Sequence, residues 1–441
     1  MQNRRGFLQG GALALGAVAA GQAAEPPKGA EASPGPADNR FGVNLHLDRF
    51  PPDLAFKQLA QAKATGVGWV RGVTCAWANV ESKKGQWKFD RPDRELDVVE
   101  AVGLQPLGCL GPSVKWAAPL DPESQKAWWG WSTYPPGDFD AWGDYVSRIV
   151  ARYKGRIRHW SPWNEPDNFG FFWPAKDKEQ QKDATWLQER REAFLKIQKT
   201  VYAAAKKADP QCLVLSGAFA MGGDYDRDFV PWLIRNGLGT ACDIVDVHMY
   251  WSVANIRRTV EATRRWLAEA GTPKPLWMTE IGASLRHEAN WIGPFSHDQL
   301  QSYAPKVLAT VLALGIERTF WYQGYTEGNS PVPLDKSEFS LAVTDGPTPA
   351  AWSFAATVRL LRAARFLGDA KLEAKSGKAV GHCFATPEGE AAILWALSPD
   401  NLDNRPASAE ALLDWQGRRI PVVLSERPTV LLGGAATRPV E

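Results

Sequence analysis

Two glutamates lie where a predicted strand ends and a loop begins. Glu165 stands in the run 163–166, Trp-Asn-Glu-Pro, after the alternating segment 155–159. A carboxyl group beside flat apolar surface, with an amide neighbour that can hold a hydroxyl group, provides what acid catalysis on a sugar requires. Glu280 ends the short apolar run 274–280 and is followed by Gly282. One such glutamate is weak evidence, but a pair at the ends of two strands predicts a glycosidase.

The elements that must position this pair follow a repeated pattern from residue 41 to residue 365. Short apolar runs predict strands at 41–46, 68–73, 104–110, 212–217, 244–250, 275–280 and 318–322, with a further strand that carries Glu165. Amphipathic runs predict helices at 52–65, 92–102, 138–152, 184–208, 226–237, 255–270, 297–314 and 349–365. Eight strand–helix units with mostly short connections predict an α/β fold, a (β/α)₈ TIM barrel. The near-continuous apolar character of the strands is typical of parallel strands that are buried on both faces.

The pattern changes after the barrel. Residues 379–385 and 391–396 predict a hairpin, and further short strands are expected at 419–424 and 428–432. We therefore expect a catalytic barrel over 40–366 and a small antiparallel, β-sandwich-like domain over 367–441. A β domain of this size is only marginally stable alone, and we therefore expect it to pack against the barrel.

The N-terminus has the composition of an export signal. Arg4 and Arg5 precede the apolar stretch 10–20, and small residues at 21–24 offer a cleavage site. Residues 1–24 thus resemble a twin-arginine signal, although a chance Arg-Arg pair in a general secretory signal is the alternative. Residues 25–39 are rich in Pro, Gly, Ala and Glu and predict a disordered spacer. The expected location is the periplasm or the exterior.

Composition narrows the class of partner. The net charge of the 441 residues is only +2, which argues against a nucleic-acid or membrane-surface partner. The apolar stretch of the signal is too short and too rich in alanine and glycine for a membrane span. The five cysteines form no CxxC pair and no histidine spacing suggests a metal, so neither a metal nor a cofactor is predicted. The tryptophans number 21. The clusters at 128–131 and 171–174 either stack on sugar rings or fill the core.

In TIM barrels the reacting groups lie at the C-terminal ends of the strands. Reading only those positions selects polar and aromatic side chains from six of the predicted strands. They are Asn44, His46, Arg71, Asn164, Glu165, His248, Tyr250, Glu280 and Trp321.

This set resembles glycoside hydrolase clan A over about residues 40–365. The motifs 68–71, Trp77, 163–166, His248-x-Tyr250 and 277–280 are most similar to family 39. That family contains β-xylosidases, α-L-iduronidases and exopolysaccharide hydrolases, and commonly has a β-sandwich appended to the barrel. Neighbouring families share most of these positions.

The resemblance implies a retaining mechanism, with Glu165 as acid/base and Glu280 as nucleophile. Arg71 and Tyr250 would keep the Glu280 carboxylate ionised, and its negative charge would raise the pKa of Glu165. The pKa of Glu165 would then fall once the glycosyl-enzyme forms, so that it can act as a base on water. Asn164 would hold the sugar 2-hydroxyl group.

The other substrate-binding candidates each have a structural alternative. Arg71 could instead be an interior ion-pair partner, and Tyr250 a core residue. His248 either contacts the sugar or only bonds other groups at the barrel end. His46 either binds a sugar hydroxyl or belongs to a closed hydrogen-bond network. The Trp321 ring is expected to form the floor of the sugar-binding subsite.

The prediction is therefore a retaining glycosidase acting on an exported oligo- or polysaccharide. An inactive glycan-binding barrel and a transglycosylase that uses the same residues are the alternatives. The two carboxyl groups should lie roughly 5 Å apart, whereas about 9 Å would indicate inversion. The loops 111–137 and 167–183 should shape the cleft, and their aromatic content favours endo action. Lys115 and Lys176 would either recognise an acidic sugar or be solvated.

Overall fold

The computed structural model describes residues 39–118, 130–221, 226–250, 252–285, 295–325, 340–343, 346–403 and 405–433. The predicted export signal, the predicted spacer up to residue 38, and two of the clustered tryptophans, Trp128 and Trp129, lie outside the described residues. No described helix is both long enough and apolar enough to cross a membrane.

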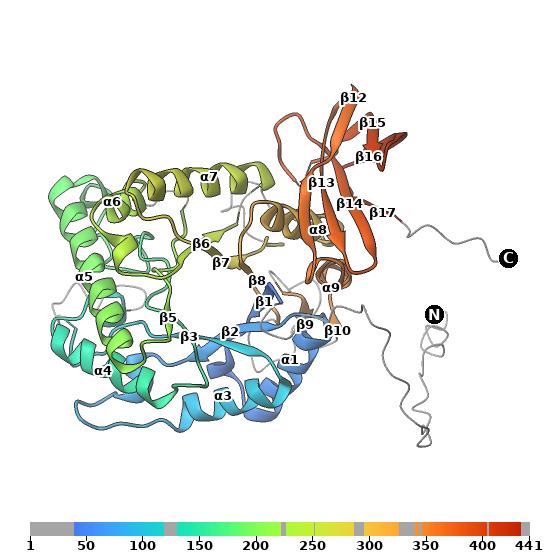
Figure 1. The fold of residues 1–441 in the computed structure, drawn as a ribbon. Coiled ribbons are helices and arrows are strands. Elements are labelled where there is room, and N and C mark those ends of the chain that lie inside the picture. The colour runs from blue at the N-terminus through green and yellow to red at the C-terminus, as the bar shows by residue number, and fades with distance from the viewer. Residues whose placement is uncertain are drawn as a thin grey trace, which may run out of the picture. The chain divides into compact units, whose positions relative to one another are not determined.

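Eight parallel strands form the predicted barrel. They are β1 Phe41–Asn44, β2 Trp69–Thr74, β3 Gln105–Cys109, β4 His159–Ser161, β5 Leu213–Val214, β6 Val245–Met249, β7 Leu276–Ile281 and β8 Arg318–Trp321. Their order is β5-β4-β3-β2-β1-β8-β7-β6. Parallel bridges from Leu215 to Ile244 and from Phe219 to Val247 join the two edges, and the strands surround a common centre in Figure 1. The TIM-barrel prediction is confirmed.

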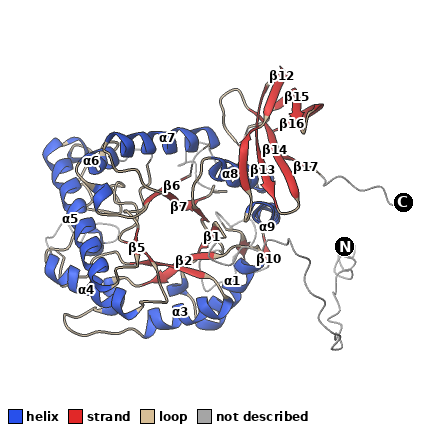
Figure 2. Ribbon diagram, in the orientation of Figure 1, coloured by secondary structure: helices blue, strands red, loops and turns tan. Residues whose placement is uncertain are grey.

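The helices lie around the outside of the strands (Figure 2). They are α1 Pro52–Ala64, α2 Trp77–Val80, α3 Asp90–Val102, α4 Phe139–Arg152, α5 Ala184–Ala208, α6 Phe229–Arg235, α7 Val253–Glu269, α8 His297–Ala313 and α9 Pro349–Leu361. Local signals set their ends. The Asp183 side chain accepts a hydrogen bond from the Trp186 N–H at the start of α5, and Ser296 and Gln299 form a capping box on α8. Gly103 ends α3 in the left-handed conformation.

Large side chains fill the interior of the barrel below the strand ends. Trp69, Trp277 and Phe320 pack against one another there, together with Leu107, Leu215 and Ile244. A second and larger core lies between the strands and the helices. Because side chains alternate along a strand, each strand contributes to both cores. The filled interior leaves polar side chains to gather at the C-terminal ends of the strands.

Two antiparallel sheets follow the barrel. Their strands are β11 Arg365–Asp369, β12 Lys371–Ser376, β13 Lys378–Thr386, β14 Gly389–Leu397, β15 Ser408–Trp415, β16 Arg418–Ser425 and β17 Thr429–Leu432. One sheet has the order β11-β13-β14-β17 and the other β12-β15-β16. Buried residues between them include Leu394, Leu413 and Leu424. The predicted C-terminal β domain is confirmed as part of the fold, and β13–β14 is the predicted hairpin, although β11, β12 and β15 were not predicted.

The β domain is attached to the barrel through α8 and α7. Lys306 of α8 pairs with Asp403 at 3.7 Å, and both side chains are almost fully buried. Asp403 also accepts a hydrogen bond of 2.8 Å from the main-chain N–H of Val253, at the start of α7. Trp395 and Phe384 of the β domain belong to the same apolar cluster as the outer core of the barrel. The two parts therefore share a continuous core.

Candidate active site

A cleft of about 550 Å³ opens at the C-terminal ends of the barrel strands. It is lined by Asn44, Leu45, His46, Arg49, Arg71, Gly72, Thr74, Cys109, Asn164, Glu165, Phe171, Tyr250, Glu280 and Tyr322. A second hollow of about 270 Å³ adjoins it and shares His46, Arg71 and Asn164 with it. Both predicted glutamates face this cleft.

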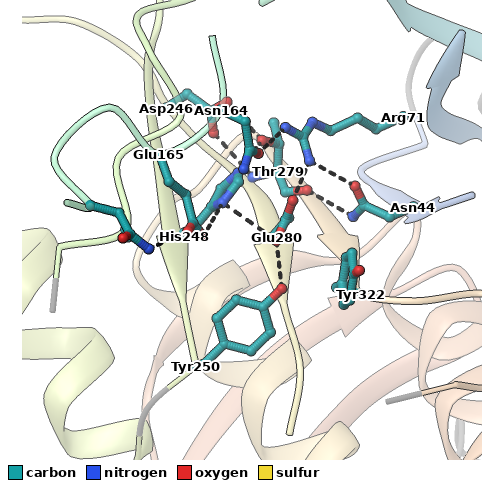
Figure 3. A network of polar contacts seen from close by, with 12 residues as sticks. Asn44, Arg71, Asn164, Glu165, Asp246, His248, Tyr250, Thr279, Glu280 and Tyr322 are labelled. Atoms are coloured by element: carbon teal, nitrogen blue, oxygen red, sulfur yellow. Dashed lines mark hydrogen bonds and ion pairs between the residues drawn. The ribbon is translucent and has the colours of Figure 1, made fainter. Parts of the chain in front are cut away.

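Glu280 near the end of β7 is held by two donors. An Arg71 guanidinium N–H from β2 donates to Oε1, and the Tyr250 hydroxyl donates to Oε2 at 2.5 Å (Figure 3). The glutamate is only 7% exposed. A cation on one oxygen and a hydroxyl donor on the other fix the orientation of this buried carboxyl group.

Glu165 comes from the segment that follows β4, not from the strand itself. Its φ is +44°, a left-handed conformation that non-glycine residues rarely adopt. The backbone is held there because the Glu165 N–H donates to the Ala218 carbonyl at 2.8 Å, beyond the end of β5. The Asn168 amide donates to Oε2 at 3.3 Å. This turn directs the Glu165 carboxyl group into the cleft.

Burial raises the pKa of Glu165 to about 7. The hydrogen bond from Asn168 and the charge of Arg71 act against burial and lower this pKa. The resemblance implies that the negative charge of Glu280 raises this pKa. The direction of the shift agrees, but its main cause is the removal of the carboxyl group from water.

The two carboxyl groups face each other across a histidine. One oxygen of Glu165, one oxygen of Glu280 and a ring nitrogen of His248 all lie within 4.8 Å of one another. His248 Nδ1 is 3.0 Å from Glu165 Oε1 and 3.5 Å from Glu280 Oε2. Burial lowers the pKa of His248 to about 3, so the ring is neutral. His248 lies behind the cleft, where it bonds other groups at the barrel end.

Two asparagines complete the surroundings of Arg71. Its Nη1 donates to Asn44 Oδ1 at 3.0 Å and its Nη2 donates to Asn164 Oδ1 at 2.6 Å. The Asn44 amide donates in turn to the Thr279 carbonyl at 2.9 Å. Since the Asn164 oxygen accepts from Arg71, its amide NH₂ group is the part available to a ligand in the cleft.

Trp321 does not line this cleft, so that prediction is wrong. The residue is 1% exposed, and its ring packs against Tyr303 of α8 and Phe354 of α9. Side chains alternate along a strand, so Phe320 points into the barrel and Trp321 points to the helices. The next residue, Tyr322, takes the position in the cleft that Trp321 was expected to hold.

His46 lies in the cleft as predicted, with its Nε2 at 3.4 Å from the Tyr322 hydroxyl oxygen. Burial lowers the pKa of His46 to about 4, so the ring is neutral. Of the cluster 171–174, Phe171 lines the cleft whereas Phe172 is fully buried in the core. Lys115 and Lys176 are exposed, and neither lines the cleft.

Three polar residues of the site were not selected by the sequence. Tyr322 follows the end of β8, and Asp246 and Thr279 lie directly beneath His248. Alternation along β6 offered a signal for Asp246, because it stands two residues before His248 and so shares its face. Thr279 gave no such signal, since it neighbours Glu280 and the pairing of β6 and β7 shifts register there.

Among the described residues, Glu165, His248 and Glu280 form one group whose spacing would allow a bound metal ion. The guanidinium group of Arg71 already pairs with Glu280 and repels a second cation. We therefore do not assign these residues as metal ligands. The five cysteines are all free thiols.

Comparison with known proteins shows similarity in structure only. No protein-family model matches the sequence, and no curated protein matches it. Among solved structures, a family 39 glycoside hydrolase from Bacteroides cellulosilyticus WH2 matches 90% of this chain and 81% of its own, with a TM-score of 0.63 and 17% identity. A monomeric beta-xylosidase from Caulobacter crescentus CB15 matches 82% of this chain and 73% of its own, with a TM-score of 0.55 and 15% identity.

A GH5_18 protein from Streptomyces cattleya in complex with GlcNAc is similar over 73% of this chain and 80% of its own, with a TM-score of 0.55 and 17% identity. At such identities the likeness concerns the fold and not the reaction. The resemblance expected from the motifs is thus confirmed at the level of the fold: over 90% of its length, this chain is similar in fold to a family 39 glycoside hydrolase.

Proposed function

We propose that this protein is a retaining glycoside hydrolase, with Glu280 as nucleophile and Glu165 as acid/base. One observation carries the proposal. Two buried carboxyl groups lie within 4.8 Å of each other in one cleft, and their surroundings differ in kind. Glu280 is held by a cation and a hydroxyl group, whereas burial raises the pKa of Glu165 to about 7. Retaining enzymes have carboxyl groups about 5 Å apart, whereas inverting enzymes need more room for a water molecule.

In the first step, an oxygen of Glu280 would attack the anomeric carbon. Protonated Glu165 would donate its proton to the glycosidic oxygen as the bond to the leaving group breaks. Arg71 and Tyr250 orient the attacking carboxylate, because each donates a hydrogen bond to a different one of its two oxygens. The product is a covalent glycosyl ester of Glu280.

In the second step, Glu165 would take a proton from a water molecule that attacks the ester. Glu280 leaves as a carboxylate, and its charge is again stabilised by Arg71. Asn164 is placed to hold the sugar 2-hydroxyl group through its amide NH₂, since Arg71 occupies its oxygen. His46, Phe171 and Tyr322 would form the walls around the sugar.

The substrate proposed is an oligo- or polysaccharide outside the cytoplasm. The arginine pair and apolar stretch of residues 1–24 support export by a twin-arginine-like signal, with 25–39 as a spacer. We propose that 40–366 forms the catalytic barrel and 367–441 the β domain.

The test compares Glu280→Gln and Glu165→Ala with the native protein on a panel of aryl glycosides. We expect Glu280→Gln to lower kcat by at least about 10,000-fold. For Glu165→Ala, added azide should restore turnover of activated substrates, because azide attacks the glycosyl-enzyme without a general base. Glu192→Gln, which changes an exposed carboxylate on α5, is the matched control and should retain full activity.

Undiminished turnover by Glu280→Gln would rule out Glu280 as the nucleophile. A native protein that binds glycans but cleaves none of the panel would instead be a glycan-binding barrel. Comparison of hydrolysis and transfer products separates a hydrolase from a transglycosylase, which would use the same two residues.

A further inference from the structure

A chain of hydrogen bonds runs from Glu165 through His248 into the barrel. His248 Nδ1 lies 3.0 Å from Glu165 Oε1, and His248 Nε2 lies 3.0 Å from Thr279 Oγ1. The Thr279 hydroxyl donates to Asp246 Oδ2 at 2.7 Å (Figure 3). Asp246 is fully buried, and the Thr279 main-chain N–H donates to its other oxygen at 3.1 Å. No step of the proposed reaction uses Asp246 or Thr279.

Counting protons along this chain determines its direction. A threonine hydroxyl has one proton, and here it goes to Asp246. Thr279 Oγ1 must then accept from His248, so the proton of the neutral ring is on Nε2. The Nδ1 atom is consequently an acceptor, and the contact at 3.0 Å is a hydrogen bond only if Glu165 supplies the proton.

We propose that Asp246 and Thr279 are positioning residues that fix the tautomer of His248, so that its Nδ1 accepts a hydrogen bond from protonated Glu165. This inference rests on the proposed function, because it assigns the groups that hold Glu165 in the form needed for the acid step.

The reverse direction would place the proton on Asp246 and leave Glu165 ionised. Burial raises the pKa of both carboxyl groups to about 7, so the hydrogen bonds decide which group keeps the proton. Asp246 has the better support for a negative charge, with a main-chain donor and the Thr279 hydroxyl at 2.7 Å. Apart from His248, the donor to Glu165 among the described residues is the Asn168 amide, at the longer distance of 3.3 Å.

Other titratable groups surround both ends of the chain. Those that act on the charges of Glu165, His248 or Asp246 come from β2, β3, β7 and the segments after β4, β6 and β8: Arg71, Cys109, Glu280, Asp167, Tyr250 and Tyr322. None of them lies between Asp246 and His248, where Thr279 makes the connection.

The substitution Asp246→Asn should reverse the donor–acceptor direction of these hydrogen bonds while keeping the bonds themselves. The Thr279 main-chain N–H requires an oxygen at the Oδ1 position, so the new NH₂ group faces Thr279 Oγ1. The Thr279 hydroxyl then donates to His248 Nε2, and the ring proton moves to Nδ1. A donor now faces Glu165 and favours its carboxylate form.

The first measurement is ¹⁵N NMR of the full chain labelled at histidine. The sequence has 6 histidines, and the His248 signals are assigned by their loss in His248→Gln. We expect Nε2–H in the native protein and Nδ1–H in Asp246→Asn. The same tautomer in both proteins would overturn the proposal, and this readout does not depend on whether the protein cleaves glycosides.

The second measurement is the pH dependence of kcat/KM on an aryl glycoside that the native protein cleaves. In Asp246→Asn the basic limb should move to lower pH by about one unit. If Asp246→Asn fails to fold, the same measurement is made on Thr279→Val and Thr279→Ser. Only Thr279→Val should show the shift, because it removes the hydroxyl group that Thr279→Ser keeps. A limb that stays in place in the folded variant contradicts the proposal, whereas a native protein without turnover contradicts only the glycosidase function.

Discussion

At the level of single residues, most of the polar side chains predicted at the strand ends line the candidate cleft, because the C-terminal ends of barrel strands lie together. Glu165, Glu280, Arg71, Asn164 and Tyr250 all line one cleft. Such positions can be recognised from sequence because polar groups at the C-terminal strand ends of a barrel either contact a ligand or pair with one another. Trp321 was misplaced because an aromatic side chain suits either face of a strand. The position at which β8 begins determines which of its side chains point into the barrel, and sequence defines strand boundaries poorly.

Tyr250 tests the support given to the nucleophile. Replacing it by Phe removes the donor to Glu280 Oε2 while keeping the ring. We expect kcat/KM on an aryl glycoside to fall about 100-fold, because a preorganised donor to a charged group at the reacting centre is lost. Tyr202→Phe, which removes a hydroxyl group bonded to Asp243 on the outside of the barrel, is the control. Equal activity of both variants would show that the Tyr250 hydroxyl has no part in catalysis.

The pKa of Glu165 predicts the basic limb of the pH profile. Burial raises this pKa to about 7, so the acid is protonated below that value and loses its proton as the pH rises through it. We expect kcat/KM on a glycoside with a poor leaving group to fall above pH of about 7. A dinitrophenyl leaving group needs no proton, so its basic limb should be weaker. A limb near pH 4 to 5 on the poor substrate would contradict the protonated resting state of Glu165.

At the scale of elements, the barrel was predictable and the β domain only in part. The helix predicted at 184–208 has the observed bounds of α5, because Asp183 caps its start and Asp209 follows its end. The strands β11 and β12 are largely exposed and have no clean alternation of apolar residues. Their pairing partners are distant in sequence, so a local pattern could not reveal them. The turn that brings Glu165 into the cleft depends on Ala218, which is also a contact beyond local sequence.

The buried pair of Lys306 and Asp403 tests how the β domain is attached. Asp403→Ala leaves the ammonium group of Lys306 buried without its partner and removes the acceptor of the Val253 N–H. The free energy of unfolding should fall by about 3 to 5 kcal/mol, as measured by denaturant unfolding. Burial lowers the pKa of Lys306 and raises that of Asp403, which shows that desolvation outweighs the attraction within the pair.

The double variant Lys306→Met with Asp403→Leu should therefore recover most of this loss. Glu269→Gln breaks an exposed pair with Arg265 and should change stability by less than about 1 kcal/mol. A fully stable Asp403→Ala variant would mean that the pair does not hold the two parts together.

At the scale of the whole molecule, the barrel and the β domain should unfold together. Trp395 and Phe384 of the β sheets pack in one apolar cluster with the outer core of the barrel. Loss of either part exposes the apolar surface of the other, which couples their unfolding. Differential scanning calorimetry should show a single transition, and Asp403→Ala should shift the whole transition. Two separate transitions in the native protein would show that the domains are independent.

The stereochemistry of hydrolysis distinguishes a double displacement through Glu280 from a single displacement by water. ¹H NMR of the first product, recorded before mutarotation, reports the anomeric configuration of the released sugar. One oxygen of Glu165 lies within 4.8 Å of one oxygen of Glu280, which leaves no room for a water molecule to attack directly, so two displacements are required. We expect a first product with the same anomeric configuration as the substrate. A first product of the opposite configuration would contradict the double displacement, and with it the assignment of Glu280 as the nucleophile.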